Sequence, residues 1–161
     1  MKMLILITNK LIIECEDTNV RNKIQKVIFT KNDDESYSFS LTKLLPIPQE
    51  TKNLVGFIEI AEDWCKAVWG TKNDVWHYNV SESGETILMS YLTEFSPNTL
   101  WVEALCRYIN SMSYHFNKNG GMRISVNYTY FKYPGLYGDI MKWTPSRGFN
   151  YMKNVSLINE R

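Results

Sequence analysis

Residues 61–76, AEDWCKAVWGTKNDVW, constrain the fold of this chain more than any other stretch. Trp64 and Val68 are four residues apart, and charged residues fall on the other side, so the stretch opens as a short amphipathic helix. Gly70 follows directly, where a left-handed residue ends a helix without a Cβ penalty. A polar loop at 71–74 comes next, and a strand is expected to begin at residue 75. The pattern therefore predicts a buried helix that presents a small polar loop between two tryptophans.

The rest of the chain alternates between helical and extended patterns. One helix is expected after Asp17, with a buried face of Val20, Ile24, Val27 and Ile28. Another is expected to start at Ser96-Pro97 and to end near Asn110, with a buried stripe that includes Trp101 and Ile109. Strands are predicted at 3–16 (with a break near 8–10), 37–42, 75–80, 86–93, 113–116, 122–131, 137–143 and 148–152.

This order of elements predicts one α+β domain over residues 1–161. No internal repeat or linker divides the chain, and its length suits one ordinary domain. Helices separated by antiparallel strands favour a two-layer sandwich, with the helices packed on one face of the sheet.

The composition limits which kinds of partner the protein is expected to bind and in which cellular compartment it is expected to work. The net charge is +1, so no overall basic field indicates nucleic acid or an anionic membrane. Cys15, Cys65 and Cys106 are odd in number, far apart and on apolar positions, which predicts buried thiols in a reducing compartment. The apolar run at 3–7 is too short for a signal sequence or a membrane span. A cytoplasmic protein with no membrane association is expected.

Several motifs, in this order, resemble the YubB/Api92-like proteins of phages, plasmids and large viruses. They are Phe39 with Leu44-Leu45-Pro46-Ile47-Pro48, Trp64 with Trp69-Gly70-Thr71-Lys72, Thr93-Glu94-Phe95-Ser96-Pro97, and Tyr128 with Tyr137-Gly138. The resemblance covers roughly residues 8–151. It implies a ferredoxin-like fold and a host-cell cytoplasmic location, but it brings no established activity.

This chain departs from the family pattern at three places. Residues 73–75 stand between Lys72 and the next aromatic residue, Trp76, whereas in the family an aromatic residue usually follows the lysine directly. Phe95 and Asn98 stand where the family has a tryptophan and a second proline.

The polar loop is the first candidate site, with Thr71, Lys72, Asp74 and Trp76 as its residues. A loop just beyond a helix end can expose backbone amides, and Lys72 can meet a phosphate or a carboxylate as a point charge. The alternative is structural: the tryptophans belong to the core, Gly70 ends the helix, and Lys72 pairs with Asp74 or lies over Trp76.

A second candidate is a protein-binding surface in the last third of the chain. Tyr133, Tyr137, Trp143 and Phe149 lie among glycines and prolines. Aromatic residues on such loops are typical of contact surfaces, and also of packed irregular segments.

Nucleic-acid binding is a third possibility, with Arg123, Tyr128 and Tyr130 on one predicted strand. Ferredoxin-like sheets in RNA-recognition modules stack bases on aromatic side chains. However, the basic and aromatic RNP1 pattern of those modules is absent.

Catalysis and metal binding have little support in the sequence. His77 and His115 stand in no HExxH motif and beside no paired cysteines, and the carboxylates are scattered. No catalytic residue, metal or cofactor is predicted. The expected function is that of a non-enzymatic accessory protein of a virus, phage or mobile element. It would modulate host machinery or defence by binding a host or viral protein or a ligand; the alternative is a nucleic-acid-binding accessory protein.

Overall fold

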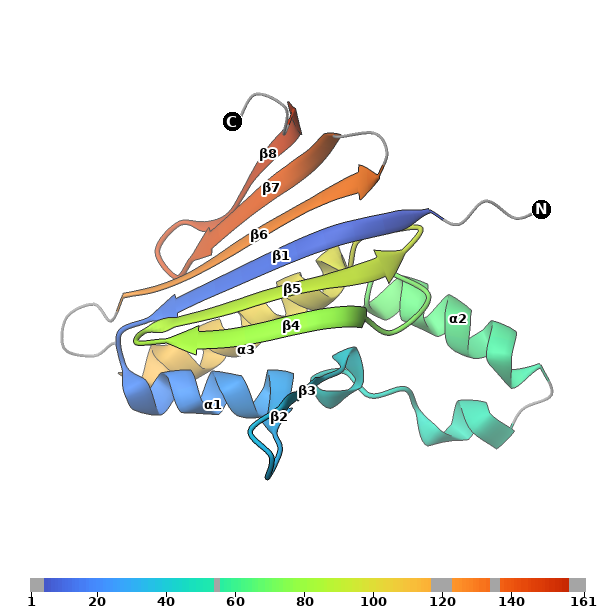
Figure 1. Cartoon of the computed structure of the whole chain (residues 1–161), viewed down its shortest axis with the longest axis horizontal. Helices are drawn as coiled ribbons and strands as arrows, with labels where there is room; N and C mark the ends of the chain where they lie inside the picture. Colours follow the sequence, from blue (N-terminus) through green and yellow to red (C-terminus); the bar gives the residue numbers. More distant parts are fainter. Residues whose placement is uncertain (1–4, 54–55, 117–122, 134–136, 157–161) are drawn as a thin grey trace.

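A computed structural model shows an α+β architecture and describes residues 5–53, 56–116, 123–133 and 137–156 (Figure 1). Its helices are α1 (Thr18–Ile28), α2 (Phe57–Val68) and α3 (Thr99–Phe116), with short 3-10 helices η1 (Leu41–Lys43) and η2 (Gln49–Asn53). Its strands are β1 (Leu6–Cys15), β2 (Phe29–Lys31), β3 (Tyr37–Phe39), β4 (Trp76–Ser83), β5 (Thr86–Glu94), β6 (Ile124–Tyr133), β7 (Tyr137–Thr144) and β8 (Gly148–Ser156).

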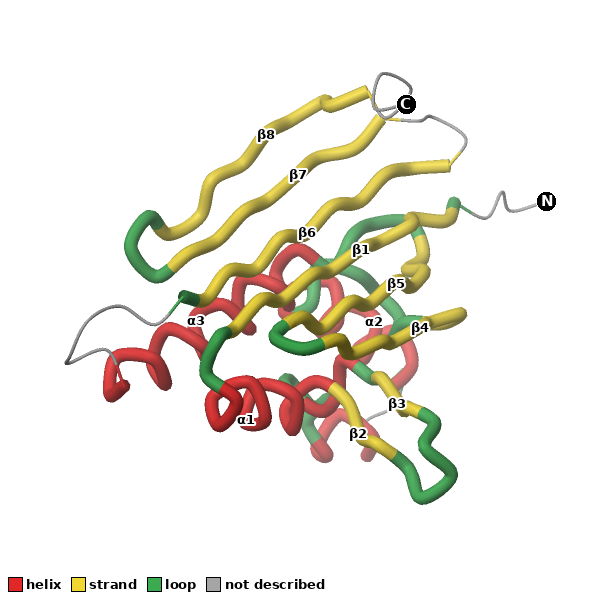
Figure 2. Tube along the Cα trace, turned by 60° about the vertical axis from the view of Figure 1, so that its left-hand side comes forward, coloured by secondary structure: helices red, strands yellow, loops and turns green. Residues whose placement is uncertain are grey.

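Six strands form one antiparallel sheet in the order β4-β5-β1-β6-β7-β8, and β2 and β3 form a separate hairpin. The first strand of the chain lies inside the sheet: its Glu14 is opposite Thr86 of β5 on one side and Ser125 of β6 on the other. The helices gather on one side of the strands (Figure 2). The expected α+β class with an antiparallel sheet is confirmed.

Strict alternation along β1 separates the two faces of the sheet. Ile7, Leu11 and Ile13 are fully buried, whereas Lys10 and Glu14 are exposed. This two-residue period is the signature of a strand with one face on the core and one in water. β1 is also continuous through residues 8–10, where the sequence predicted a break.

The break is absent because Asn9 is buried with its amide bonded. Its Nδ2 donates to Tyr91 O (3.3 Å) and Thr93 Oγ1 (3.1 Å), and its Oδ1 accepts from the Tyr128 hydroxyl (2.5 Å). Burial raises the pKa of the Tyr91 and Tyr128 phenols, so both stay protonated at neutral pH. A polar residue therefore fits the buried face of a strand because neighbouring strands supply its partners.

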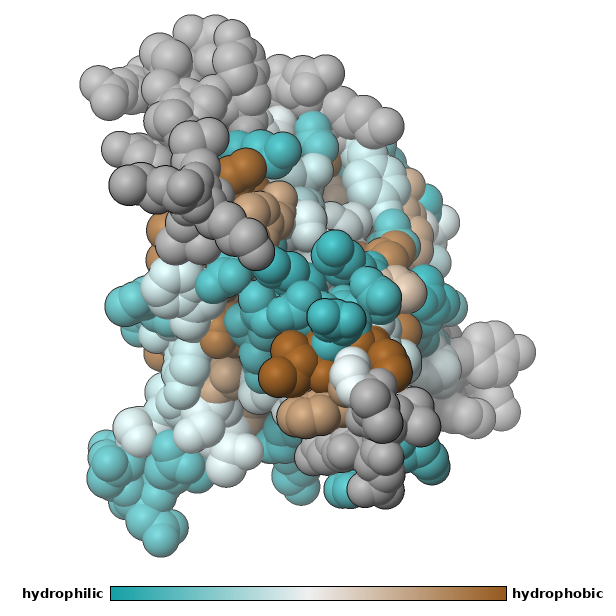
Figure 3. All heavy atoms as spheres, turned by 90° about the vertical axis from the view of Figure 1, so that its right-hand side faces the viewer, coloured by the Kyte–Doolittle hydropathy of each residue, from teal (hydrophilic) through white to brown (hydrophobic). Residues whose placement is uncertain are grey.

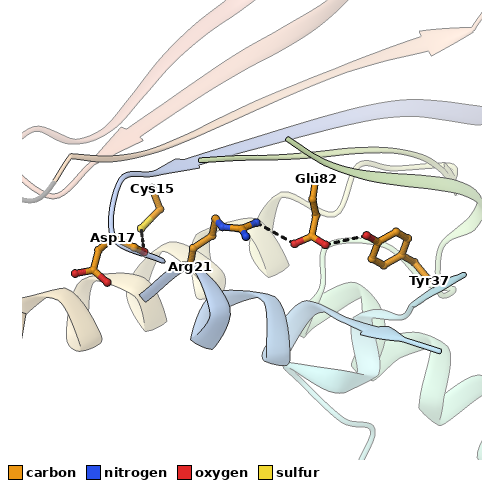
Figure 4. A network of polar contacts seen from close by, with 5 residues as sticks. All are labelled: Cys15, Asp17, Arg21, Tyr37 and Glu82. Atoms are coloured by element: carbon orange, nitrogen blue, oxygen red, sulfur yellow. Dashed lines mark hydrogen bonds and ion pairs between the residues drawn. The ribbon is translucent and has the colours of Figure 1, made fainter. Parts of the chain in front are cut away.

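Helix α1 forms as its sequence predicts. Asp17 Oδ1 accepts from Val20 N (3.0 Å) and caps the helix, which buries Val20, Ile24 and Ile28. Arg21 forms an ion pair with Glu82 of β4 (2.9 Å), and the Tyr37 hydroxyl donates to the other Glu82 oxygen (2.8 Å; Figure 4). This bond raises the pKa of Tyr37. The three residues tie the β2–β3 hairpin to α1 and the sheet.

Helix α3 keeps its predicted stripe but not its predicted ends. Trp101, Val102, Leu105, Cys106 and Ile109 are all fully buried. The helix begins at Thr99, and Asn98 O accepts from Val102 N (3.1 Å). It continues to Phe116, so the strand predicted at 113–116 is wrong; no glycine or proline after Asn110 stops the helix there. In the described part of the chain, no helix is both long and apolar enough to cross a membrane.

Helix α2 is longer than its amphipathic pattern indicates, because it begins at Phe57 rather than near residue 60. The three cysteines are free and buried, as predicted.

Candidate functional site

Buried tryptophans hold the loop at residues 69–75, here called the 69–75 loop, against two other segments. Trp69 is 1% exposed, and its indole nitrogen donates to Leu45 O (2.9 Å). Its backbone carbonyl accepts from Trp101 N (3.1 Å), at the start of α3. The Trp101 indole in turn donates to Leu41 O (3.0 Å). The Trp69 indole therefore fixes the loop to the segment that follows β3, and its backbone carbonyl fixes the loop to α3. The Trp101 indole ties α3 to the same segment.

Position 70 requires glycine for two reasons: its backbone conformation and the close packing around its Cα atom. Its φ is +90°, as the helix-end interpretation predicts, and a Cβ atom there would lie 3.0 Å from Pro97 O. Gly70 O accepts from the Ser96 hydroxyl (2.7 Å). The glycine thus permits close contact between the loop and the segment before α3.

Two of the predicted ligand-binding residues bond to the protein itself. Asp74 Oδ1 accepts from Leu41 N and Val75 N, each at 2.8 Å, and its Oδ2 accepts from the Ser40 hydroxyl. Thr71 is fully buried and donates to Glu94 O (3.1 Å). These polar atoms stabilise the loop through bonds within the protein.

Lys72 and Trp76 are placed differently from each other. Lys72 Nζ lies 4.4 Å from the ring centre of Phe95, a cation–π contact, and forms no ion pair among the described residues. Trp76 starts β4 opposite Leu92, and its indole nitrogen is buried without a hydrogen-bond partner in the described structure. Among the four predicted residues, Lys72 keeps its charge free for a ligand.

A groove of about 260 Å³ lies between α2 and the 69–75 loop. Phe57 and Ile58 stand on its rim and are 46% and 61% exposed. This side of the molecule carries a compact hydrophobic patch below a hydrophilic band (Figure 3). The other lining residues come from the 41–47 segment, α2 and the loop: Thr42, Ile47, Ala61, Glu62, Cys65, Trp69, Lys72, Asn73 and Asp74.

The sequence interpretation missed Phe57 and Ile58. Adjacent apolar residues point in different directions on a helix, so Ile58 falls outside the stripe of Trp64 and Val68. An apolar pair directly after Gly56, in a stretch with no clear period, was the available signal.

Cys65 lies in the lining of the groove and is 3% exposed. Burial raises the pKa of its thiol to about 11, and the carboxylates of Asp74 and Glu62 act in the same direction. The thiol is therefore protonated at neutral pH, which makes it a weak nucleophile and a lining group rather than a reactive one.

The aromatic residues of the last third do not form one exposed surface in the described structure. Trp143 is 4% exposed, and Phe149 is half-buried against the core. The side chains of Tyr133 and Tyr137 lie outside the described residues, although their backbones belong to β6 and β7. The prediction of a partner surface there remains untested.

The three residues predicted for nucleic-acid binding lie in different environments. Tyr128 is fully buried on the helix side of β6, so its ring offers no face to a base. Tyr130 is on the same side, and its hydroxyl donates to Asp139. Arg123 is exposed at the start of β6. The structure therefore does not bring these residues together as a stacking surface.

No protein-family model matches this chain, and neither a curated protein nor a solved structure matches it.

Proposed function

We propose that this chain is a non-enzymatic accessory protein that binds apolar side chains of a partner protein in the groove beside α2. The observation that carries the proposal is the exposure of Phe57 and Ile58 at the start of α2, next to a concave surface. Exposing two adjacent large apolar side chains is unfavourable in water, and a protein contact would remove that cost.

Polar residues on one side of the groove would fix the orientation of a bound partner segment. Lys72 is at the rim without an ion-pair partner among the described residues, and Asn73 Nδ2 donates to Glu94 (2.9 Å). A partner segment with an apolar anchor, and with a carboxylate at Lys72 away from Glu62 and Asp74, would match this arrangement. Anchors of this type supply most of the binding energy of protein interfaces.

The proposal includes a ferredoxin-like core. Its support is the chain order β1, α1, β4, β5, α3, β6 together with the spatial order β4-β5-β1-β6. In this proposal β7 and β8 extend that core, and the segment from β2 to α2 is inserted between α1 and β4. The resemblance to the YubB/Api92-like proteins supports a role for a virus, phage or mobile element in the host cytoplasm, where the partner is a host or viral protein.

Photo-crosslinking tests the groove. A benzophenone amino acid at Phe57 should give a discrete adduct with one protein in host cells, and Ile58→Glu should abolish that adduct. Leu100→Glu is a matched control, because Ile58 and Leu100 are exposed at 61% and 41% and each is the second residue of its helix. A carboxylate in the first helical turn is favourable, so both variants should fold. The proposal is wrong if Ile58→Glu and Leu100→Glu affect the adduct equally.

The nucleic-acid alternative makes a different prediction. Single-stranded oligonucleotides would bind with an affinity that falls steeply as salt is added, and Arg123→Ala would weaken that binding. Ile58→Glu would leave oligonucleotide binding unchanged.

A further inference from the structure

A cavity of about 620 Å³ opens at one end of the sheet, away from the groove beside α2. Its lining includes Glu14 of β1, Ser125 of β6 and Lys142 of β7. These residues alternate with the buried Ile13, Val126 and Trp143, so they point away from the helices. These side chains of the lining therefore lie on the face of the sheet away from the helices, which gather on the other side of the strands (Figure 2), while the buried Cys15 and Ile124 border the cavity at this end of the sheet.

The lining of this cavity carries opposite charges on two sides, which meet where Glu16 is hydrogen-bonded to the backbone of Arg123. Glu14 and Glu16 at the end of β1, with Glu85 of the β4–β5 turn, form an acidic side. Arg123 at the start of β6 and Lys142 of β7 form a basic side. The hydroxyls of Ser125, Thr144 and Ser146 add hydrogen-bonding groups of either polarity on the basic side.

These charges do not neutralise one another across the cavity. In the described structure, Lys142 and the Arg123 guanidinium form no ion pair, and the carboxylates of Glu14 and Glu85 accept no hydrogen bond. Glu16 is bonded locally, because its Oε1 accepts from Arg123 N (2.8 Å).

The register of the sheet explains why Glu14 and Lys142 are too far apart to form an ion pair. Glu14 is opposite Ser125, and Lys142 is opposite Asn127, so Glu14 and Lys142 are two strands and two residues apart. Their Cα atoms are then about 12 Å apart, a span that a small molecule can bridge. The cavity volume is within the range of small-molecule sites.

We infer that this cavity binds a small dipolar cation with the chemistry of a basic amino acid. A carboxylate on the ligand would meet Lys142 and the forked guanidinium of Arg123, a geometry that suits carboxylates. Amino or guanidinium groups would meet the glutamates. Three carboxylates oppose two cations in the lining, so the complementary ligand has one more positive than negative charge. This site is separate from the groove beside α2, so it stands or fails independently of the proposed function.

An NMR titration of the full chain with L-arginine tests this inference, using agmatine and L-glutamate for comparison. L-Arginine should give saturable shifts at residues of the cavity, with a Kd on the order of 1 mM because the charges are exposed. Agmatine has no carboxylate and should bind about fivefold more weakly. L-Glutamate should not saturate.

Substitutions on the basic and acidic sides of the cavity test each side separately. Lys142→Met should weaken L-arginine binding about fivefold and leave agmatine binding unchanged, whereas Glu14→Gln should weaken both. Lys10→Met is the matched control, because Lys10 is an exposed lysine on the same face that does not line the cavity. Absence of saturation by L-arginine, equal affinity for agmatine, or equal effects of Lys142→Met and Lys10→Met would each overturn the inference.

Discussion

The 69–75 loop and the cavity at one end of the sheet use polar residues in opposite ways. In the loop, Asp74 accepts three hydrogen bonds and the Thr71 hydroxyl is buried against Glu94 O. In the cavity, Lys142 and Glu14 point into solvent and have no ion-pair partner in the described structure. Polar groups that bond within the protein position the chain, whereas polar groups without internal partners are available to a ligand. The comparison predicts large stability effects in the loop and binding effects in the cavity.

The largest effect is expected from Trp69→Ala. Removing this buried ring leaves a cavity and orphans Leu45 O, so the free energy of unfolding should fall by about 3–5 kcal/mol. Urea denaturation followed by circular dichroism measures the change. Leu100→Ala, at an exposed position, should change the free energy by less than about 0.5 kcal/mol. A loss below about 1 kcal/mol for Trp69→Ala would show that the ring does not anchor the loop.

Asp74→Ala comes next, with an expected loss of about 2–3 kcal/mol in the same experiment. The substitution leaves Leu41 N and Val75 N without the acceptor that both share. Asp63→Ala removes an exposed carboxylate of α2 and should be nearly neutral. Equal effects of the two substitutions on the free energy of unfolding would show that Asp74 does not stabilise the loop.

Thr71→Val should cost about 1 kcal/mol, because it keeps the shape of the side chain but removes one buried hydrogen bond to Glu94 O. Thr86→Val, at a half-buried position at the start of β5, is the comparison in thermal denaturation. If Thr71→Val leaves stability unchanged while Thr86→Val lowers it, the hydroxyl of Thr71 is not a structural group.

The smallest stability effect is expected in the cavity. Lys142→Met should change the free energy of unfolding by less than about 0.5 kcal/mol, because the lysine has no internal partner to lose. Arg21→Met removes a cation that is paired with Glu82 and should cost about 1 kcal/mol. The contrast between the loop and the cavity fails if Lys142→Met destabilises the protein as much as Arg21→Met.

The parts of the fold that local pattern predicted are those with a clear period or a clear turn. Val20, Ile24 and Ile28 predicted α1, and the strand predicted at 86–93 is β5. The errors fall where local signals are ambiguous. Residues 113–116 read equally well as a strand or as the end of a helix, and tertiary context decides such cases.

The candidate sites also differ in how far local sequence could predict them. Trp69, Gly70 and Lys72 form one continuous motif, so the sequence could single out the loop but not the inward bonding of Asp74 and Thr71. Glu14, Arg123 and Lys142 come from three strands that are distant in sequence. Only the strand order β1-β6-β7 brings them to one cavity, and no local pattern contains that order.

The position of β1 has a consequence for biosynthesis. β1 ends at Cys15, whereas one of its two neighbours, β6, begins at Ile124 and is synthesised much later. β1 must therefore wait until β6 has been translated, which makes their pairing a late and non-local step. A nascent or prematurely terminated chain that ends before β6 would present the backbone edge of β1 to other chains, and such edges are templates for aggregation.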